Sequence, residues 1–213
     1  MKTGRVWLFD LDNTLHNASP HIFPHINRSM REYIERHLGV DTQEATRIRQ
    51  HYWVRYGATL LGLMRHHQTN PHHFLWETHQ FPDLPRMVDF DKTIIHMLRR
   101  LPGRKIIFSN APRHYTEAIL EITGLGHCFD AVYAVENVKF QPKPMLSGFR
   151  SLLRAEHLDP RQCIMVEDSL PNLVSAKRLG MKTVWVSTGS RQSPFVDVKL
   201  GSVRHLPQRC GRL

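Results

Sequence analysis

The chain has 213 residues, of which 41% are hydrophobic and 23% are charged. These values are ordinary for a globular protein and exclude collagen-like, coiled-coil and disordered chains, and no apolar run approaches the roughly 20 residues that a membrane helix needs. The 29 basic and 19 acidic residues give a formal net charge of +10, which is compatible with anionic partners.

The sequence predicts a cytoplasmic protein with no membrane association. Asp10 and Asp12 interrupt the N-terminal stretch in which an export signal would need an apolar region. The three cysteines (Cys128, Cys163 and Cys210) form no CxxC pair, so neither a zinc site nor a disulfide framework is predicted, and reduced thiols are favoured. The basic residues are dispersed, which makes nucleic acid the less favoured partner. The sequence does not indicate an oligomeric state.

Five short apolar segments predict the strands of a parallel sheet. Polar residues follow three of them, as they do at the carboxyl ends of buried parallel strands. The segments are 6–9, 105–108, 131–135, 163–166 and 183–186. Helical patterns lie between the last four, at 115–122, 145–156 and 171–179. This alternation predicts a Rossmann-like α/β fold, in which a three-layer core has helices on both faces of the sheet.

The segment 16–100 interrupts the alternation and contains no predicted strand. Helix starts are predicted at Ser19-Pro20, Asp41-Thr42 and Asn70-Pro71. We therefore expect two domains, an α/β core at 1–15 and 101–213 and a helical cap at 16–100, inserted where it would cover the site as a lid. The last helix of this segment, near 91–101, is also compatible with the sheet layer.

The motif Asp10-Leu11-Asp12-Asn13-Thr14 follows the first predicted strand. Two carboxylates one residue apart lie on the same side of an extended backbone, where they repel each other unless they share a cation or a proton. Mg²⁺ is the best-fitting cation because it prefers oxygen ligands. With it bound, one carboxylate can attack a phosphoryl group and the other can carry a proton. A helix cap or a turn is the alternative explanation.

Three later groups of residues supply what phosphate chemistry needs. Ser109-Asn110 offers a hydroxyl and backbone donors for phosphate oxygens. Lys143 lies between two prolines and offers a cation in a restricted backbone. Glu167-Asp168 offers further carboxylates for a metal. Ligands of open parallel sheets bind beyond the carboxyl ends of the strands, so the groups at strand ends predict one site.

The four motifs together resemble the haloacid dehalogenase-like hydrolase superfamily, over nearly the whole chain up to about Thr188. The resemblance implies a magnesium-dependent aspartyl-phosphate mechanism and identifies the helical insertion as a C1-type cap. It implies that Asp10 is the nucleophile and Asp12 the general acid/base. The presence of Asp12 favours a phosphatase, because the dehalogenase branch lacks this acid/base.

The same resemblance assigns the remaining site residues. Ser109 and Lys143 match the residues that orient the phosphate, next to the backbone donors expected at Asn110. The implied metal ligands are Asp10, the backbone carbonyl of Asp12, and Asp168, and Glu167 assists directly or through water.

The segment from Tyr56 to Met64 resembles the YGTTLxGL segment of pyrimidine 5′-nucleotidases. This resemblance implies a pyrimidine nucleoside 5′-monophosphate as substrate, and Tyr56 and Thr59 could stack on and hydrogen-bond to its base. Two positions depart from the family: Ala58 replaces a threonine and Glu167 replaces an aspartate. A packed helix joint is the alternative explanation for the segment.

Two other functions remain open alternatives. A sugar phosphate or phosphoglycolate is the alternative substrate. A non-catalytic protein that binds nucleic acid through its net charge is the alternative of another class, although binding alone does not need a paired nucleophile and acid. The histidine pairs His66-His67 and His72-His73 lack metal-site spacing, so we expect them to be surface residues.

Overall fold

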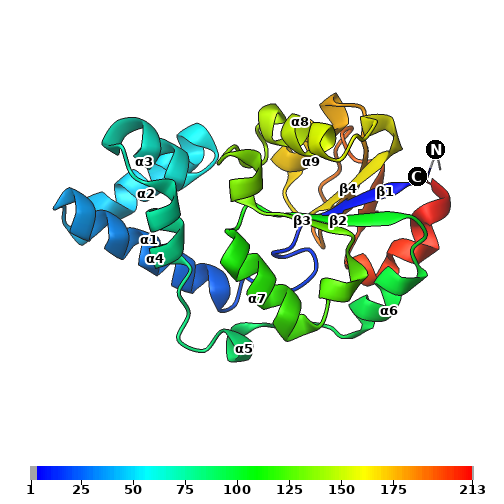
Figure 1. Cartoon of the computed structure of the whole chain (residues 1–213), viewed down its shortest axis with the longest axis horizontal. Helices are drawn as coiled ribbons and strands as arrows, with labels where there is room; N and C mark the ends of the chain where they lie inside the picture. Colours follow the sequence, from blue (N-terminus) through cyan, green and yellow to red (C-terminus); the bar gives the residue numbers. More distant parts are fainter. Residues whose placement is uncertain (1–3, 213) are drawn as a thin grey trace. The chain divides into compact units, whose positions relative to one another are not determined.

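The computed structural model describes residues 4–212, and the chain divides into two compact units (Figure 1). Residues 4–17 and 89–212 form the sheet unit, and residues 18–88 form the helical unit. The helix at 93–100, whose assignment the sequence left open, falls in the sheet unit.

The sheet unit contains six described parallel strands in the order β3-β2-β1-β4-β5-β6. They are β1 (Val6–Phe9), β2 (Arg104–Phe108), β3 (Ala131–Tyr133), β4 (Cys163–Glu167), β5 (Lys182–Val186) and β6 (Val198–Leu200). β1 is central and pairs with β2 and β4, and all four of its residues are buried. A strand covered on both faces needs a continuous apolar sequence, which is why Val-Trp-Leu-Phe was recognisable.

Helices cover both faces of this sheet, with α8 and α9 on one face and α6 and α7 on the other (Figure 1). These helices are α6 (Thr93–Arg100), α7 (Arg113–Thr123), α8 (Leu146–Ala155) and α9 (Leu170–Arg178). Short 3₁₀ segments are η1 (Gly126–Cys128), η2 (Val135–Val138), η3 (Pro160–Gln162) and η4 (Val203–Arg212). The predicted three-layer α/β fold is confirmed.

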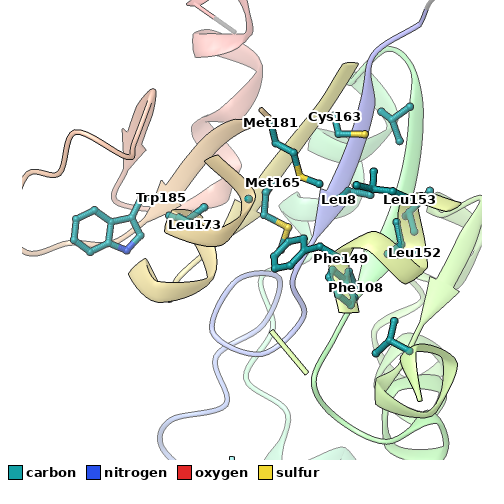
Figure 2. Packing of buried hydrophobic residues seen from close by; sticks show 14 residues of the cluster. Leu8, Phe108, Phe149, Leu152, Leu153, Cys163, Met165, Leu173, Met181 and Trp185 are labelled. Atoms are coloured by element: carbon teal, nitrogen blue, oxygen red, sulfur yellow. The ribbon is translucent and has the colours of Figure 1, made fainter. Parts of the chain in front are cut away.

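The core between the sheet and α8 and α9 is formed by alternate residues of the central strands (Figure 2). Leu8, Phe108 and Met165 come from three adjacent strands and are fully buried. Phe149 of α8 meets Phe108 edge to face, with ring centroids 5.1 Å apart. This packing anchors the strands whose carboxyl ends carry the predicted site residues.

Two strand predictions were incomplete. The strand expected at 131–135 ends at Tyr133, because Val135 already begins the 3₁₀ segment η2. The edge strand β6 was not predicted, because its three residues, Val-Lys-Leu, are too short to show a periodic pattern.

The helical unit consists of α1 (Ile22–Leu38), α2 (Thr42–Tyr56), α3 (Thr59–His67), α4 (Pro71–Thr78) and α5 (Leu84–Met87). Asp41 and Asn70 cap α2 and α4 by accepting hydrogen bonds from backbone N–H groups, which confirms two of the predicted helix starts. The third was wrong by a few residues, because α1 begins at Ile22 rather than at Ser19-Pro20. Among the described residues, none of the helices has the length and apolar character to span a membrane.

Candidate active site at the carboxyl ends of β1, β2 and β4

The backbone brings three of the predicted groups together. Asp10 follows β1, and its N–H donates to the carbonyl of Val166 in β4 at 3.0 Å. Ser109 follows β2, and its N–H donates to the carbonyl of Tyr133 in β3 at 2.9 Å. Glu167 is the last residue of β4. Because the strands are parallel, these residues lie at the same edge of the sheet.

Lys143 connects the carboxyl ends of three strands, β1, β2 and β4. Its ammonium nitrogen Nζ lies 2.6 Å from Asp10 Oδ1, 2.8 Å from Glu167 Oε2 and 2.6 Å from the carbonyl oxygen of Phe108. The residue as a whole is 1% exposed. Three acceptors match the three protons of the ammonium group, so this buried cation is fully hydrogen-bonded.

The backbone around Lys143 is held by Asn110. The Asn110 side-chain amide donates to the carbonyl of Lys143 at 2.9 Å, and its oxygen accepts from the N–H of Lys143 at 2.8 Å. The side chain of Asn110 therefore positions Lys143, which leaves the predicted phosphate contact to its backbone. Gly148 of α8 contributes as well, because a Cβ there would collide with the carbonyl of Gln141 in the same loop.

Three carboxyl groups, those of Asp10, Glu167 and Asp168, have one oxygen each within 4.8 Å of one another. Burial, followed by repulsion from Glu167, raises the pKa of Asp10 to about 7 despite Lys143. Burial likewise raises the pKa of Glu167 to about 7 and raises that of Asp168. The pKa of Lys143 is also raised: burial alone would lower it, but the attraction of Asp10 and Glu167 outweighs burial.

One ammonium group does not balance three carboxylates, so the group carries excess negative charge when ionised. A hard divalent cation relieves such an excess, and oxygen ligands at this spacing suit Mg²⁺. The donor set therefore fits a magnesium ion. The side chains of Asp10, Asp168 and Glu167, which the sequence assigned to the metal, lie together in this group.

The side chain of Asp12 is held by two other residues. Tyr115 of α7 donates its hydroxyl hydrogen to Asp12 Oδ1 at 2.6 Å, and His16 Nε2 lies 2.9 Å from the same oxygen. Both partners are buried. The predicted metal contact of Asp12 involves its backbone carbonyl, which this arrangement leaves as a prediction.

Two of these neighbours were not predicted from the sequence. His16 lies four residues after Asp12, and the turn between them brings the two side chains into contact. Tyr115 lies 103 residues away from Asp12, and only the placement of α7 brings it there. Thr14, which belongs to the predicted motif, donates to Asp10 Oδ2 at 3.2 Å.

Ser109 is buried, and its hydroxyl oxygen accepts a hydrogen bond from the N–H of Ala111 at 3.0 Å. This bond orients the hydroxyl oxygen while leaving its hydrogen to donate elsewhere. Arg113, at the start of α7, is exposed and pairs with Glu117 at 3.6 Å.

Tyr56 and Thr59 lie in the helical unit, at the junction of α2 and α3. Thr59 is buried, and its hydroxyl donates to the carbonyl of Arg49 at 3.1 Å. The hydroxyl of Tyr56 lies 2.6 Å from His66 Nε2. These contacts are internal to the helical unit, so the predicted contacts of the two residues with a substrate stay predictions.

The two glycines of the same segment have structural explanations. Gly57 ends α2 with a φ of 83°, a left-handed conformation that glycine adopts without strain. Gly62 allows α3 to approach Tyr52, whose ring would collide with any Cβ at this position. Both observations agree with the packed helix joint that was the alternative explanation for the segment.

A profile of haloacid dehalogenase-like hydrolases matches residues 5–180. The chain belongs to this family. Validoxylamine A 7′-phosphate phosphatase of Streptomyces hygroscopicus subsp. limoneus is 28% identical over 109 residues, which cover 50% of this chain and 51% of that protein. Glyceraldehyde 3-phosphate phosphatase of Pyrococcus abyssi is 28% identical over 209 residues, which cover 87% and 82%. The chain thus spans about half the length of the first of these relatives.

Solved structures of the family share the fold of the whole chain. The HAD phosphatase from Thermococcus onnurineus is 23% identical, with a TM-score of 0.69 and coverage of 97% of this chain and 98% of that one. The HAD-hydrolase YfnB from Bacillus subtilis, solved bound to magnesium, is 15% identical, with a TM-score of 0.60 and coverage of 96% and 97%. At these identities the likeness concerns the fold.

Proposed function

We propose that this hydrolase is a phosphomonoesterase that transfers the phosphoryl group of a small phosphate ester first to Asp10 and then to water. The observation that carries the proposal is the position of Lys143, whose ammonium group bonds both Asp10 and Glu167 beside a third carboxylate. A carboxylate held at a strand end next to a fixed cation suits attack on the phosphorus atom of a phosphoryl group, whose non-bridging oxygens are negatively charged.

The proposed reaction has two steps and uses two carboxyl groups, Asp10 as nucleophile and Asp12 as proton donor and acceptor. In the first step an oxygen of Asp10 bonds to phosphorus, the ester P–O bond breaks, and the leaving alkoxide takes a proton from Asp12. In the second step Asp12 accepts a proton from water, the water oxygen attacks phosphorus, and the bond to Asp10 breaks to release phosphate. Tyr115 and His16 hold Asp12 in place for both transfers.

Asp10, Asp168 and the backbone carbonyl of Asp12 would hold the magnesium ion, with Glu167 in direct or water-mediated contact. When bound, the ion supplies positive charge for the phosphoryl oxygens. Two observations support it: the three-carboxylate group of this chain and the magnesium bound to the related YfnB fold. Lys143 and the Ser109 hydroxyl supply the remaining neutralising contacts.

A sugar phosphate, or a similar small polyhydroxylated phosphate ester, is the best-supported substrate class. Two relatives are named as phosphatases of validoxylamine A 7′-phosphate and of glyceraldehyde 3-phosphate. Pyrimidine nucleoside 5′-monophosphates are the second candidate, and one observation favours them: the sequence of the segment from Tyr56 to Met64.

Phosphate release from a panel of sugar phosphates and nucleoside monophosphates, with magnesium present, tests the proposal. Asp10→Asn keeps the shape of the nucleophile and removes its charge, so it is the matched control. Asp10-dependent turnover confined to sugar phosphates would support the first substrate class. Turnover that prefers UMP, CMP or dTMP, and that Tyr56→Ala reduces through KM, would support the second. Absence of Asp10-dependent turnover, together with salt-sensitive retention of nucleic acid, would contradict the enzyme assignment.

A further inference from the structure

A second cluster of metal-ligating side chains lies in the helical unit, outside the proposed active site. His37 comes from the C-terminal end of α1, and His73 and Glu77 come from adjacent turns of α4. One ligand atom of each lies within 4.8 Å of the others. All three belong to the helical unit, so the cluster does not depend on how the two units are placed.

Both imidazole rings are oriented by one buried residue, Tyr33. His37 Nδ1 lies 2.9 Å from the backbone carbonyl of Tyr33, a group that only accepts, so Nδ1 carries the hydrogen. This fixes the neutral ring as the tautomer with its lone pair on Nε2. The Tyr33 ring also stacks on His37, with centroids 3.9 Å apart. His37 is therefore prepared to bind a metal through Nε2.

His73 is oriented by contacts at both of its ring nitrogens. Its Nδ1 lies 3.1 Å from the hydroxyl of Tyr33, and its Nε2 lies 2.8 Å from Glu77 Oε1. Histidines that bind metals commonly engage the second ring nitrogen with a carbonyl, a carboxylate or another oxygen group. Tyr33 supplies this partner to both rings, through its carbonyl to His37 and through its hydroxyl to His73.

Glu77 divides its two oxygens between two partners. Oε2 bonds Arg36 at 2.6 Å, and Oε1 faces His73. Arg36 thus fixes the carboxylate and leaves one oxygen directed at the imidazole. In a tetrahedral zinc site with bonds of about 2.0–2.1 Å, neighbouring ligand atoms are roughly 3.3 Å apart. The contact between His73 and Glu77 is shorter, so the ion would replace this hydrogen bond and separate the two atoms slightly.

We propose that His37, His73 and Glu77 form a zinc site on the helical unit, with water as the fourth ligand. Two imidazoles and one carboxylate are a ligand set that favours Zn²⁺ over Mg²⁺. The bound ion links α1 to α4 and closes the loop between residues 37 and 73, so it stabilises the helical unit. A pair of histidine and glutamate at helical spacing on an exposed face also occurs without a metal; the two oriented rings distinguish this cluster from such a pair.

Calorimetric titration of the full chain with Zn²⁺ tests the proposal. The sample is prepared without a polyhistidine tag, which would itself bind zinc, and excess Mg²⁺ is added to occupy the carboxylates at the strand ends. The wild type should bind one equivalent. His37→Ala and His73→Ala should each weaken zinc binding by about ten-fold or more. Tyr33→Phe should weaken it by a similar factor, because His73 loses the hydroxyl that orients its ring. His51→Ala removes an exposed histidine of α2 and is the matched control, with unchanged binding.

Two further measurements keep the outcome decisive. Far-ultraviolet circular dichroism of each variant reports whether it folds, and the melting temperature of the wild type, but not of His73→Ala, should rise with Zn²⁺. Co²⁺ in place of Zn²⁺ should give the visible absorption of a four-coordinate site. Zinc binding that persists unchanged in the His37→Ala/His73→Ala double variant, or no binding by the wild type, would overturn the proposal.

Discussion

The hydroxyl of Tyr115, on α7, donates to the carboxylate of Asp12 at 2.6 Å, although the two residues are 103 positions apart in the chain. Tyr115 is 1% exposed, and burial, followed by the nearby Asp12 carboxylate, raises the pKa of its phenol above the usual range. The phenol therefore stays protonated and can donate its hydrogen to Asp12. Its function in the proposed reaction is to hold Asp12 in one orientation.

The first prediction concerns this contact. Tyr115→Phe keeps the ring and removes the donor, so kcat for phosphate ester hydrolysis should fall by roughly ten-fold while KM changes little, because proton transfer suffers and binding does not. Steady-state kinetics measure both. Tyr133→Phe is the control. It also removes a partly buried hydrogen bond of a tyrosine hydroxyl to a carboxylate, that of Glu156 at 2.6 Å, and should leave kcat unchanged. Equal losses in the two variants would contradict the positioning role.

The second prediction concerns Lys143 and the metal. Lys143→Met leaves Asp10 and Glu167 buried without their partner, which should lower the free energy of unfolding by about 3–5 kcal/mol and abolish activity. Mg²⁺ should raise the melting temperature of the variant more than that of the wild type, because the ion is then the main source of positive charge. Thermal unfolding with Mg²⁺ and with a chelator measures the difference; equal shifts in both proteins would contradict the proposed metal position.

The third prediction tests the loop that carries Lys143. A Cβ at position 148 collides with the carbonyl of Gln141, so Gly148→Ala should displace this loop and cost about 1–3 kcal/mol of stability. Because Lys143 moves with the loop, kcat should fall as well. Gly126→Ala is the matched control, since no atom lies within 4 Å of its added Cβ. Chemical denaturation and kinetics on both variants decide; an unchanged Gly148→Ala protein would show that the loop adapts freely.

The fourth prediction is a pH dependence away from the active site. Burial alone would raise the pKa of Asp197, but Lys177 and Thr183 donate hydrogen bonds to its carboxylate and hold the pKa below its usual value. A carboxyl group with a lowered pKa stabilises the fold above its unfolded pKa of about 3.9, and this stabilisation is lost as the pH falls through the folded value.

Asp197→Asn should therefore destabilise the protein at pH 7, and the difference from the wild type should shrink as the solution is acidified below about pH 4. The free energy of unfolding, measured by denaturant titration across this range, checks the sign. A difference that stays constant with pH would mean that the ionised form of Asp197 contributes nothing to stability.

The strand ends that carry the proposed active site were predictable because local sequence and sheet geometry point to the same place. The apolar residues of β1 predict a buried strand, and the two aspartates directly after it must then emerge at the edge of the sheet. The position of Glu167 near these aspartates was predictable for the same reason, because it ends the strand β4. Lys143 was recognisable from its flanking prolines, although its bond to Phe108 depends on a loop that sequence patterns do not describe.

The contacts that the sequence could not predict depend on how elements pack. Tyr115 reaches Asp12 because α7 begins shortly after the carboxyl end of β2, which pairs with β1. His37 and His73 belong to different helices. The spacing of neighbouring histidines, such as His72 and His73, therefore could not reveal that His37 and His73 lie together. The close approach of Gly62 to the ring of Tyr52 likewise depends on how α2 and α3 pack together.

One nitrogen atom, Lys143 Nζ, bonds groups at the ends of three adjacent strands, β1, β2 and β4. A local opening that separates any two of these strands must also break bonds of this buried cation. The three strands should therefore open as one cooperative unit, and their backbone amides should exchange with deuterium at similar, slow rates. The edge strands β3 and β6, which lie beyond this connection, can fray first without exposing Asp10, the proposed nucleophile.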